Sequence, residues 1–425
     1  MKATCYLLLL FGIIDRSVFA AIERSTDANV YVDNSPGYTI GAYYWPNVHV
    51  DPRNEKWFGP GWTEWEITKW ARPRFPGHDQ PKVPFWGYED ESDPTVMAKK
   101  IDTAAKYGVD VLIFDWYYYN DGSFLRAALD KGFLGAPNNR KVKFALMWAN
   151  HDMPDVFPAK LAQSYPNWRV LIPGAVTRQA FDKMVDDIIE KYFKNPSYWL
   201  IDGAPYFSVY DLETLIKGLG GYEETRNALH DFRAKTKAAG FPDLHLNVIL
   251  RGDTVVGGGA FVKLNGSGST APTLDQNGMS KDLGFDSLGS YTWVHNVTFP
   301  DFPITQYSYV RKKAMEYNLQ TIAKFDLPYY ANVTCGWDST PRMCATDMFI
   351  PKGYPFMGVL VGNTPAEFKR SLSEMKEFLD TKGNKQKIFS INSWNEWTEG
   401  SYLEPDATNG FGFLEAVKEV FGRGN

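Results

Sequence analysis

The chain has 425 residues, of which 44% are hydrophobic, 22% charged and 16% aromatic. This composition is typical of a globular protein with a sizeable core and argues against a disordered or collagen-like chain. The formal net charge of −5 provides no basic surplus for nucleic-acid phosphates, so we expect no nucleic-acid partner. The 14 Trp, 24 Tyr and 28 Phe exceed what core filling normally requires, and such rings stack well on sugars, which indicates a carbohydrate partner.

Residues 1–20 have the pattern of a targeting segment. Lys2 precedes an apolar run at residues 5–14, and residues 18–20 resemble a cleavage site. This pattern predicts a signal peptide over residues 1–20 and a secreted mature chain, 21–425, extracellular or, in a bacterium, periplasmic. Asp15 and Arg16 interrupt the apolar run, so an uncleaved N-terminal anchor is the alternative. A membrane span needs roughly 20 apolar residues, and no stretch of the mature chain is that long, so we expect no span there.

Strand-like runs of β-branched and aromatic residues alternate with amphipathic helical segments along residues 21–425. The predicted strands are residues 38–44, 109–115, 142–148, 206–210, 244–250, 287–292, 329–333 and 388–393. The predicted helices include residues 95–107, 181–193, 222–239, 308–323 and 365–379. This alternation predicts an α/β fold, a single-domain (β/α)8 TIM barrel with enlarged βα loops. A doubly wound open sheet is the alternative, but no G-x-G-x-x-G motif follows the first strand.

In a (β/α)8 barrel the catalytic residues lie at the C-terminal ends of the strands. Here, aromatic residues occur at those ends together with amides or carboxylates after five of the predicted strands. One such cluster is more often part of a core, whereas its repetition at equivalent positions predicts a sugar-binding cleft. The predicted substrate-binding residues are Tyr43, Tyr44, Trp45, Glu64, Trp65, Asp115, Trp116, Tyr118, Trp148, Asn150, Trp337, Asp338, Asn395, Trp397 and Glu404. Four of these residues are acids, namely Glu64, Asp115, Asp338 and Glu404. For each acid taken alone, a structural salt bridge is at least as good an explanation.

Two cysteines remain after the predicted cleavage, Cys335 and Cys344, and they enclose a short segment after the seventh strand. A cysteine pair in an exported chain predicts one disulfide between them. Two free thiols are the alternative, because spacing alone does not show whether the two Cα atoms come close enough.

Glu396 and Glu399 are the sharpest chemical feature, because two carboxyl groups three residues apart at a strand end can both face one bound sugar. Cleavage of a glycosidic bond uses one protonated and one ionised carboxyl group, and mutual repulsion with partial burial separates their pKa values. The alternative is a solvated pair that caps a following helix. The chain has no His-Glu-x-x-His and no Gly-x-Ser-x-Gly motif, so we expect no metal and no cofactor. We expect a monomer.

Five segments carry a family resemblance, and they read YYWP (43–46), WFGPGWTEW (57–65), WAN (148–150), GWDSTPR (336–342) and WNEWTEGSYLEPD (394–406). Together they resemble the WbsX-type proteins, which are related to the family 99 glycoside hydrolases, the endo-α-mannosidases. The resemblance implies a (β/α)8 barrel and a retaining glycosidase. It implies that Glu396 is the base that assists attack of the substrate's own 2-hydroxyl on the anomeric carbon. It implies that Glu399 is the acid that protonates the leaving oxygen and then the base that activates water.

A secreted glycoside hydrolase acting on a polysaccharide or oligosaccharide is therefore the leading functional interpretation. A glycosyltransferase of polysaccharide biosynthesis is the first alternative, because WbsX-type proteins carry that label. A carbohydrate-binding protein without catalysis is the second. The substrate does not follow from the resemblance, because the chain departs from many relatives at the end of the first strand and at Asn150-His151.

Overall fold

The fold is built on parallel strands, and the computed structural model describes residues 37–256 and 274–422. The barrel strands are β1 (Thr39–Tyr44), β2 (Val111–Tyr119), β4 (Lys143–Trp148), β8 (Ala204–Val209), β9 (His245–Ile249), β10 (Ser287–Gly289), β12 (Tyr329–Tyr330) continued by β13 (Asn332–Thr334), and β15 (Ile388–Asn392). All eight predicted strands are confirmed, although the sixth ends at Gly289. The predicted signal peptide, residues 1–20, lies outside the described residues.

The two ends of the sheet meet on the strand that is interrupted at Ala331. β12 pairs with β10, where Leu288 lies opposite Tyr329. β13 pairs with β15, where Val333 lies opposite Ile391. Between these two pairs, the Ala331 carbonyl accepts a hydrogen bond from the Ser390 N–H at 2.9 Å. With parallel pairing along the rest of the path β10-β9-β8-β4-β2-β1-β15, this strand completes a barrel, which confirms the predicted fold.

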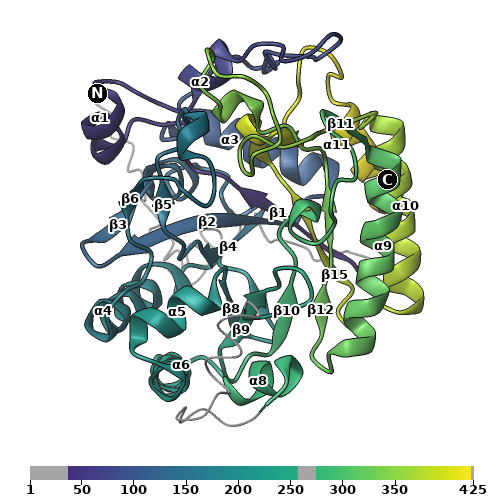
Figure 1. Cartoon of the computed structure of the whole chain (residues 1–425). Helices are drawn as coiled ribbons and strands as arrows, with labels where there is room; N and C mark the ends of the chain where they lie inside the picture. The colour runs from purple at the N-terminus through teal and green to yellow at the C-terminus, as the bar shows by residue number, and fades with distance from the viewer. Residues whose placement is uncertain (1–36, 257–273, 423–425) are drawn as a thin grey trace, which may run out of the picture. The chain divides into compact units, whose positions relative to one another are not determined.

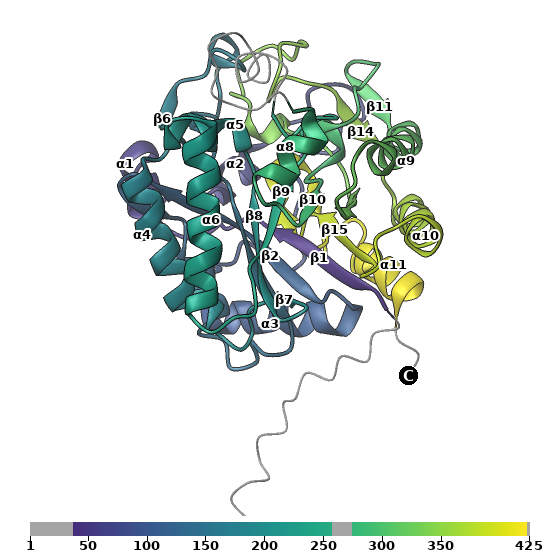
Figure 2. The ribbon, with the colours of Figure 1, turned by 90° about the horizontal axis from the view of Figure 1, so that it is seen from below.

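The helices flank the barrel, with α4, α5 and α6 on one side and α9, α10 and α11 on the other (Figures 1 and 2). Their bounds are α1 (Pro52–Phe58), α2 (Trp65–Trp70), α3 (Pro94–Tyr107), α4 (Arg178–Ile188) extended by a π-helical turn (Ile189–Phe193), α5 (Leu212–Leu219), α6 (Tyr222–Ala238), α8 (Gln276–Asp282), α9 (Tyr307–Lys324), α10 (Pro365–Thr381) and α11 (Gly412–Phe421). The five predicted helices are confirmed. Among the described residues, no helix combines the length and hydropathy needed to cross a membrane.

Shorter strands and helical turns lie outside the eight barrel strands. The remaining strands are β3 (Gly122–Phe124), β5 (Met153–Pro154), β6 (Val170–Ile172), β7 (Leu200–Ile201), β11 (Ile304–Gln306), β14 (Val359–Val361), β16 (Asn395–Glu396) and β17 (Ser401–Tyr402). The remaining helical turns are η2 (Ala128–Phe133), η3 (Leu161–Gln163), η5 (Trp293–His295), η6 (Thr340–Arg342) and η7 (Trp397–Glu399).

Side chains along each barrel strand alternate between the interior and the layer under the helices, because the period of a strand is two residues. On β2, Val111 and Ile113 belong to the interior cluster of the barrel, whereas Phe114 and Trp116 belong to the large outer core. The same alternation places Asp115 on the interior side, where only 2% of its surface is exposed. Asp115 is thus an acidic group inside the barrel, at the midpoint of β2.

The predicted disulfide is wrong, since Cys335 and Cys344 are both free thiols. Cys335 directly follows β13 and is 1% exposed within the outer core. Cys344 lies beyond η6, where its N–H donates to the Ala159 carbonyl at 2.8 Å. The helical turn between the two cysteines carries the second of them to a different neighbouring loop.

We expect the two thiols to differ in reactivity. In the native full-length chain under non-reducing conditions, a thiol reagent modifies Cys344, which is half-buried, and spares Cys335, which reacts only after unfolding. Peptide mapping after alkylation assigns each site, and Cys344→Ser serves as the control that removes the fast reaction. A peptide containing both cysteines joined to each other before reduction would contradict this assignment.

Candidate active site

Glu396 and Glu399 lie on a tight hairpin that follows β15. Strands β16 and β17 pair antiparallel, with Glu396 opposite Ser401, and the turn η7 between them carries Glu399. Gly400 closes the turn at a φ of 63°, and a Cβ atom there would lie 2.8 Å from the Cβ of Asp338. This position therefore requires glycine. The two glutamates are 3% and 6% exposed, so the hairpin presents them as buried groups.

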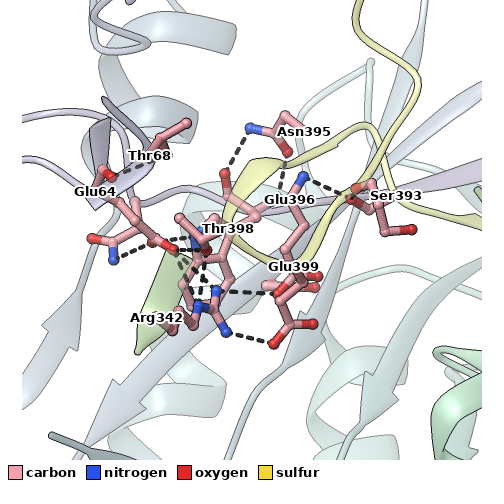
Figure 3. A network of polar contacts seen from close by, with 12 residues as sticks. Glu64, Thr68, Arg342, Ser393, Asn395, Glu396, Thr398 and Glu399 are labelled. Carbon is pink, nitrogen blue, oxygen red and sulfur yellow. Dashed lines mark hydrogen bonds and ion pairs between the residues drawn. The ribbon is translucent and has the colours of Figure 1, made fainter. Parts of the chain in front are cut away.

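Arg342 is the cation that faces both glutamates. Its Nη1 atom donates to Glu399 Oε1 at 2.5 Å, and its Nη2 atom lies 3.4 Å from Glu396 Oε1. Nη2 also donates to Glu64 Oε1 at 3.0 Å. The side chains converge on the guanidinium group in Figure 3. One positive charge, 4% exposed, thus compensates three buried carboxyl groups.

Glu64 connects this centre to the loop after β1. Its Oε2 atom accepts hydrogen bonds from Trp45 Nε1 at 2.5 Å and Asn47 Nδ2 at 2.7 Å, and its Oε1 atom accepts one from the Thr398 hydroxyl. The Arg342 guanidinium lies over the Trp45 ring at 5.1 Å. The hydrogen-bonding capacity of Glu64 is therefore used to position its neighbours.

Tyr291, which follows β10, lies between two carboxyl groups on the opposite side of the pair. Its hydroxyl oxygen is 2.8 Å from Asp115 Oδ2 and 2.9 Å from Glu396 Oε2. A phenol has one proton to donate. Both contacts are satisfied as hydrogen bonds only if one of the two carboxyl groups carries a proton, so this arrangement retains a proton beside Glu396.

The pKa directions agree with that geometry. Burial raises the pKa of Glu396 well above its usual range, and the neighbouring charge of Glu399 adds to the effect. Burial also raises the pKa of Glu399, but Arg342 and the hydroxyl of Tyr354 oppose this rise. The two neighbouring carboxyl groups influence each other, so they titrate as a coupled pair. Arg342 favours the ionised form of Glu399, so a proton on this pair resides toward Glu396.

A second cluster of buried charges supports the hairpin from behind. Lys100 Nζ lies 2.5 Å from Glu91 Oε1 and 2.6 Å from Glu404 Oε1. Glu404 in turn accepts hydrogen bonds from the indoles of Trp394 at 3.0 Å and Trp397 at 2.8 Å. Glu404 therefore orients the two tryptophans that flank Asn395 and Glu396.

Asn395 ties this cluster to the first strand. Its amide group donates to Glu91 Oε1 at 2.9 Å and to the Trp45 carbonyl at 2.8 Å, and it accepts from the Trp45 N–H at 2.8 Å. The residue immediately before Glu396 is therefore held at both ends of its side chain, which limits the orientations open to that glutamate.

Asp338 is engaged by several donors. Gln80 Nε2 and His78 Nε2 lie 2.6 Å and 2.8 Å from Asp338 Oδ2, and Thr340 donates to Oδ1 through its N–H and its hydroxyl. Burial alone would raise the pKa of Asp338, but the hydrogen bonds and the His78 ring outweigh it and hold the pKa below its usual range. The Asp338 N–H also donates to the Glu399 carbonyl at 2.6 Å, so this aspartate orients the hairpin.

The predicted site residues fall into four groups. Those at the carboxyl centre are Trp45, Glu64, Asp115, Asn395, Glu396 and Glu399, with the Tyr43 ring packed at a tilt against Tyr291 inside the barrel. Those that support the hairpin are Trp65, Trp397 and Glu404. Trp337 and Asp338 line a neighbouring cavity. Tyr44, Trp116, Tyr118 and Trp148 lie in the outer core, and Asn150 bonds the backbone of Asp211 through both ends of its amide.

Three residues of the centre, Tyr291, Arg342 and Tyr354, did not emerge from the sequence as site residues. Tyr291 lies near the end of the predicted strand 287–292 and follows the observed β10, a position that could have indicated it. Arg342 lies in one of the family motifs but was assigned no role. Tyr354, whose hydroxyl donates to Glu399 at 2.7 Å, lies in a loop without any sequence signal.

Comparisons with known proteins give a family and a fold. The family model described as Glycosyltransferase WbsX matches residues 40–417. Proteins from two strains of Xanthomonas campestris pv. campestris, both described as uncharacterized protein WxcX, are 26% identical, with 96% of this chain and 53% of each relative aligned. The chain thus spans about half the length of the curated relatives it matches.

Solved structures with the same fold include two glycoside hydrolase-type proteins. The GH99 endo-α-mannosidase from Bacteroides thetaiotaomicron matches with a TM-score of 0.53 and 14% identity, covering 90% of this chain and 96% of that one. A glycoside hydrolase-like protein matches with a TM-score of 0.58 and 14% identity, covering 91% and 95%. At this level of identity, the likeness concerns the fold.

Removal of the Arg342 charge should destabilise the protein in a pH-dependent manner. Loss of one partner of a buried ion pair lowers the free energy of unfolding by roughly 3–5 kcal/mol, and we expect this loss in Arg342→Met at pH 7.5. Without the cation the pKa values of Glu396 and Glu399 rise further in the folded state, so the penalty grows as the pH rises and shrinks toward pH 5. Urea unfolding at both pH values measures it.

Arg178→Met is the matched control, because Arg178 forms ion pairs with Asp182 and Asp231 at the surface. Its effect should stay below about 1 kcal/mol at both pH values. An Arg342→Met loss that is equal at pH 5 and pH 7.5 would show that the guanidinium does not compensate these carboxyl groups.

Glu91 provides a second pH-dependent test. Burial raises the pKa of Glu91 to about 7, although Lys100 opposes the rise. An acid whose pKa is raised on folding stabilises the fold below its unfolded pKa, and that contribution is lost as the pH rises through about 7. The uncharged variant Glu91→Gln lacks this pH-dependent loss. The free energy of unfolding of the variant minus that of the natural protein should therefore increase from pH 5.5 to pH 8, as measured by thermal unfolding. The control variant Glu190→Gln, at an exposed position, should differ in stability from the natural protein by less than about 1 kcal/mol at either pH. A stability difference for Glu91→Gln that is the same at both pH values would refute the raised pKa of Glu91.

Proposed function

The chain belongs to the WbsX family, and from that membership and the chemistry of its carboxyl centre we propose that it is a glycoside hydrolase. Its substrate is a polysaccharide or other glycan, from which it cleaves glycosidic bonds. The observation that supports the proposal is the buried Glu396–Glu399 pair at the mouth of a barrel, in which burial raises the pKa of Glu396 well above its usual range and Arg342 contacts Glu399. Such a pair offers an acid and a base at the same place, as glycosidic cleavage requires.

The proposed reaction retains the configuration of the anomeric carbon. Glu396 takes the proton of the substrate's 2-hydroxyl, whose oxygen attacks the anomeric carbon, while Glu399 gives a proton to the departing oxygen. Glu399 then removes a proton from water, which opens the cyclic intermediate, and Glu396 returns its proton to the 2-oxygen. Tyr291 and Asp115 support this order, because they place a proton relay beside Glu396.

Arg342 determines the protonation state of Glu399 before the first step of this reaction. Its Nη1 atom donates to Glu399 Oε1 at 2.5 Å, which favours the Glu399 carboxylate. Glu399 therefore acts as an acid only after the shared proton has moved to it from Glu396. A sugar that engages Glu396 through its 2-hydroxyl favours that transfer, since it supplies a hydrogen-bond donor to the ionised Glu396.

Transfer to a sugar acceptor is the second candidate, because the family model is described as a glycosyltransferase. Both reactions break a glycosidic bond and differ in whether water or a sugar hydroxyl receives the glycosyl group. A polysaccharide panel that includes α-mannans, with product analysis in the presence and absence of a free acceptor sugar, separates them. We also propose that the protein is secreted, on the basis of the apolar segment within residues 1–20.

The separate roles of the two glutamates predict different kinetics. In Glu399→Gln, cleavage of a glycan with a poor leaving group should fall by about 10²–10⁴-fold, whereas an aryl glycoside with an activated leaving group should be affected much less, because it departs without protonation. In Glu396→Gln, both substrates should be cleaved more slowly by similar factors, because the attacking step is impaired. Steady-state rates on both substrates measure this difference.

Glu419→Gln provides the control, because Glu419 is paired with Lys369 on the exposed face of α11. It should retain the natural rates, and circular dichroism should show all three variants folded. A rate near that of the natural protein in Glu396→Gln or Glu399→Gln would remove that residue from the mechanism, and hydrolysis of no member of the panel would argue against the proposed function.

A further inference from the structure

A polar cavity lies beside the hairpin that carries Glu396 and Glu399. It encloses about 280 Å³ and is lined by residues 75–82 between α2 and α3, by the segments after β13 and β17, by β14, and by the beginnings of α10 and α11. It shares Asp338 and Gly400 with the surroundings of the active site, but its lining includes neither Glu396, Glu399 nor Arg342. The cavity is thus adjacent to the carboxyl centre without being part of it.

The lining combines flat apolar rings with unused polar atoms. Phe75, Trp337 and Phe413 contribute the rings. The Trp337 side chain is 4% exposed, and its indole N–H is itself buried without a hydrogen-bond partner among the described residues, so its ring rather than this N–H group faces the cavity. Pyranose rings stack on aromatic faces and form hydrogen bonds with polar groups beside them.

Two amide side chains complete the polar part of the lining. Asn363 donates to the Cys335 carbonyl at 3.3 Å, and Asn409 donates to Asp406 Oδ2 at 3.0 Å. Within the described residues, the side-chain oxygen of each asparagine accepts no hydrogen bond. An amide held in place through one N–H group presents its oxygen and second N–H group as a fixed acceptor and donor, which matches the paired character of sugar hydroxyls.

The acidic side chains near the cavity already have partners within the protein, so they do not require a charged ligand. Asp406 accepts from the Tyr402 hydroxyl at 3.0 Å and from the Thr408 N–H at 2.9 Å, and Asp79 forms an ion pair with Lys82 at 2.6 Å. Asp338, which also lines the cavity, is engaged by Gln80, Thr340 and the His78 ring. The cavity therefore suits an uncharged, hydroxyl-rich ligand, and its volume lies just below the range of roughly 300–1,000 Å³ that drug-sized ligands occupy.

Aromatic rings continue from the cavity toward the surface. Phe75 stacks on Phe349 with ring centroids 6.0 Å apart, and Phe349 contacts Phe302 at 4.6 Å. Phe302 is 36% exposed, and Met348 next to Phe349 is 69% exposed. This row of rings provides a surface along which a chain of sugars can extend beyond the cavity.

We propose that this cavity is a second carbohydrate-binding site, which takes one neutral pyranose residue of the glycan at a place separate from the residues that cleave it. The proposal rests on the proposed function only for the class of ligand. Occupancy of the site holds the polymer beside the hairpin and raises the effective concentration of its other residues at Glu396 and Glu399.

Binding of small sugars to the full-length chain tests the site without any turnover. The probes are the methyl pyranosides of mannose, glucose, galactose and N-acetylglucosamine, observed by saturation-transfer NMR. We expect at least one probe to bind, Thr408→Trp to abolish its binding by filling the cavity, and Asn363→Ala to weaken it by up to about tenfold, the equivalent of one hydrogen bond. Ala407→Trp is the matched control, because it adds the same indole at an exposed neighbour outside the lining and should leave binding unchanged.

The outcomes separate this inference from the proposed function. If a probe binds and Thr408→Trp abolishes its binding, the cavity site stands even when no glycan is hydrolysed. If glycans are hydrolysed but no probe binds, or if Thr408→Trp binds as the natural protein does, the inference is overturned. Loss of binding in Ala407→Trp as well would assign the effect to a disturbed loop and would also overturn it, and thermal unfolding of each variant confirms that it is folded.

Discussion

The centre of this protein is governed by a shortage of positive charge. Glu64, Glu396 and Glu399 converge on a single guanidinium group, that of Arg342, and all four side chains are nearly excluded from solvent. Buried carboxylates are stable only when they are paired or protonated. Because one cation serves three acids, the site must retain a proton, and the hydroxyl of Tyr291 between Asp115 and Glu396 is where the structure accommodates it. The chemistry we propose follows from that enforced protonation.

Much of the surrounding structure serves to hold this arrangement in place. The catalytic hairpin lies between two charged clusters, one around Arg342 and one around Lys100. The second cluster reaches the hairpin through Glu404, which orients Trp394 and Trp397, and through Glu91, which holds Asn395. Since these contacts come from the loop after β1, from α3 and from the segment after β15, the two glutamates are positioned by parts of the chain that are far apart in sequence. Such positioning allows a pair of carboxyl groups to remain close despite their mutual repulsion.

The abundance of aromatic residues has two different explanations in this fold. Some of the rings lie under the helices and contribute to the outer core, as Trp116 and Trp148 do. Others lie at the mouth or beside it, as Trp45 does above Arg342 and Trp337 does in the neighbouring cavity. Strand alternation separates the two groups, because neighbouring residues on a strand point to opposite faces. A cluster of consecutive aromatic residues at a strand end therefore divides between core and site.

The sequence by itself determined the barrel and the acid pair. Eight apolar runs separated by helical segments are local patterns, and Glu396 and Glu399 are close in space because they are close in the chain. Only the tertiary structure decided which groups surround them, since Tyr291 and Arg342 reach Glu396 across 105 and 54 residues and no local pattern encodes such contacts. The same limit explains the error on Cys335 and Cys344, whose pairing was predicted because they are the two cysteines of the expected mature chain, whereas the fold holds Cys335 in the outer core and Cys344 against Ala159. Short-range patterns follow from backbone periodicity, whereas the charge balance of a site depends on long-range packing that is specified by the fold as a whole.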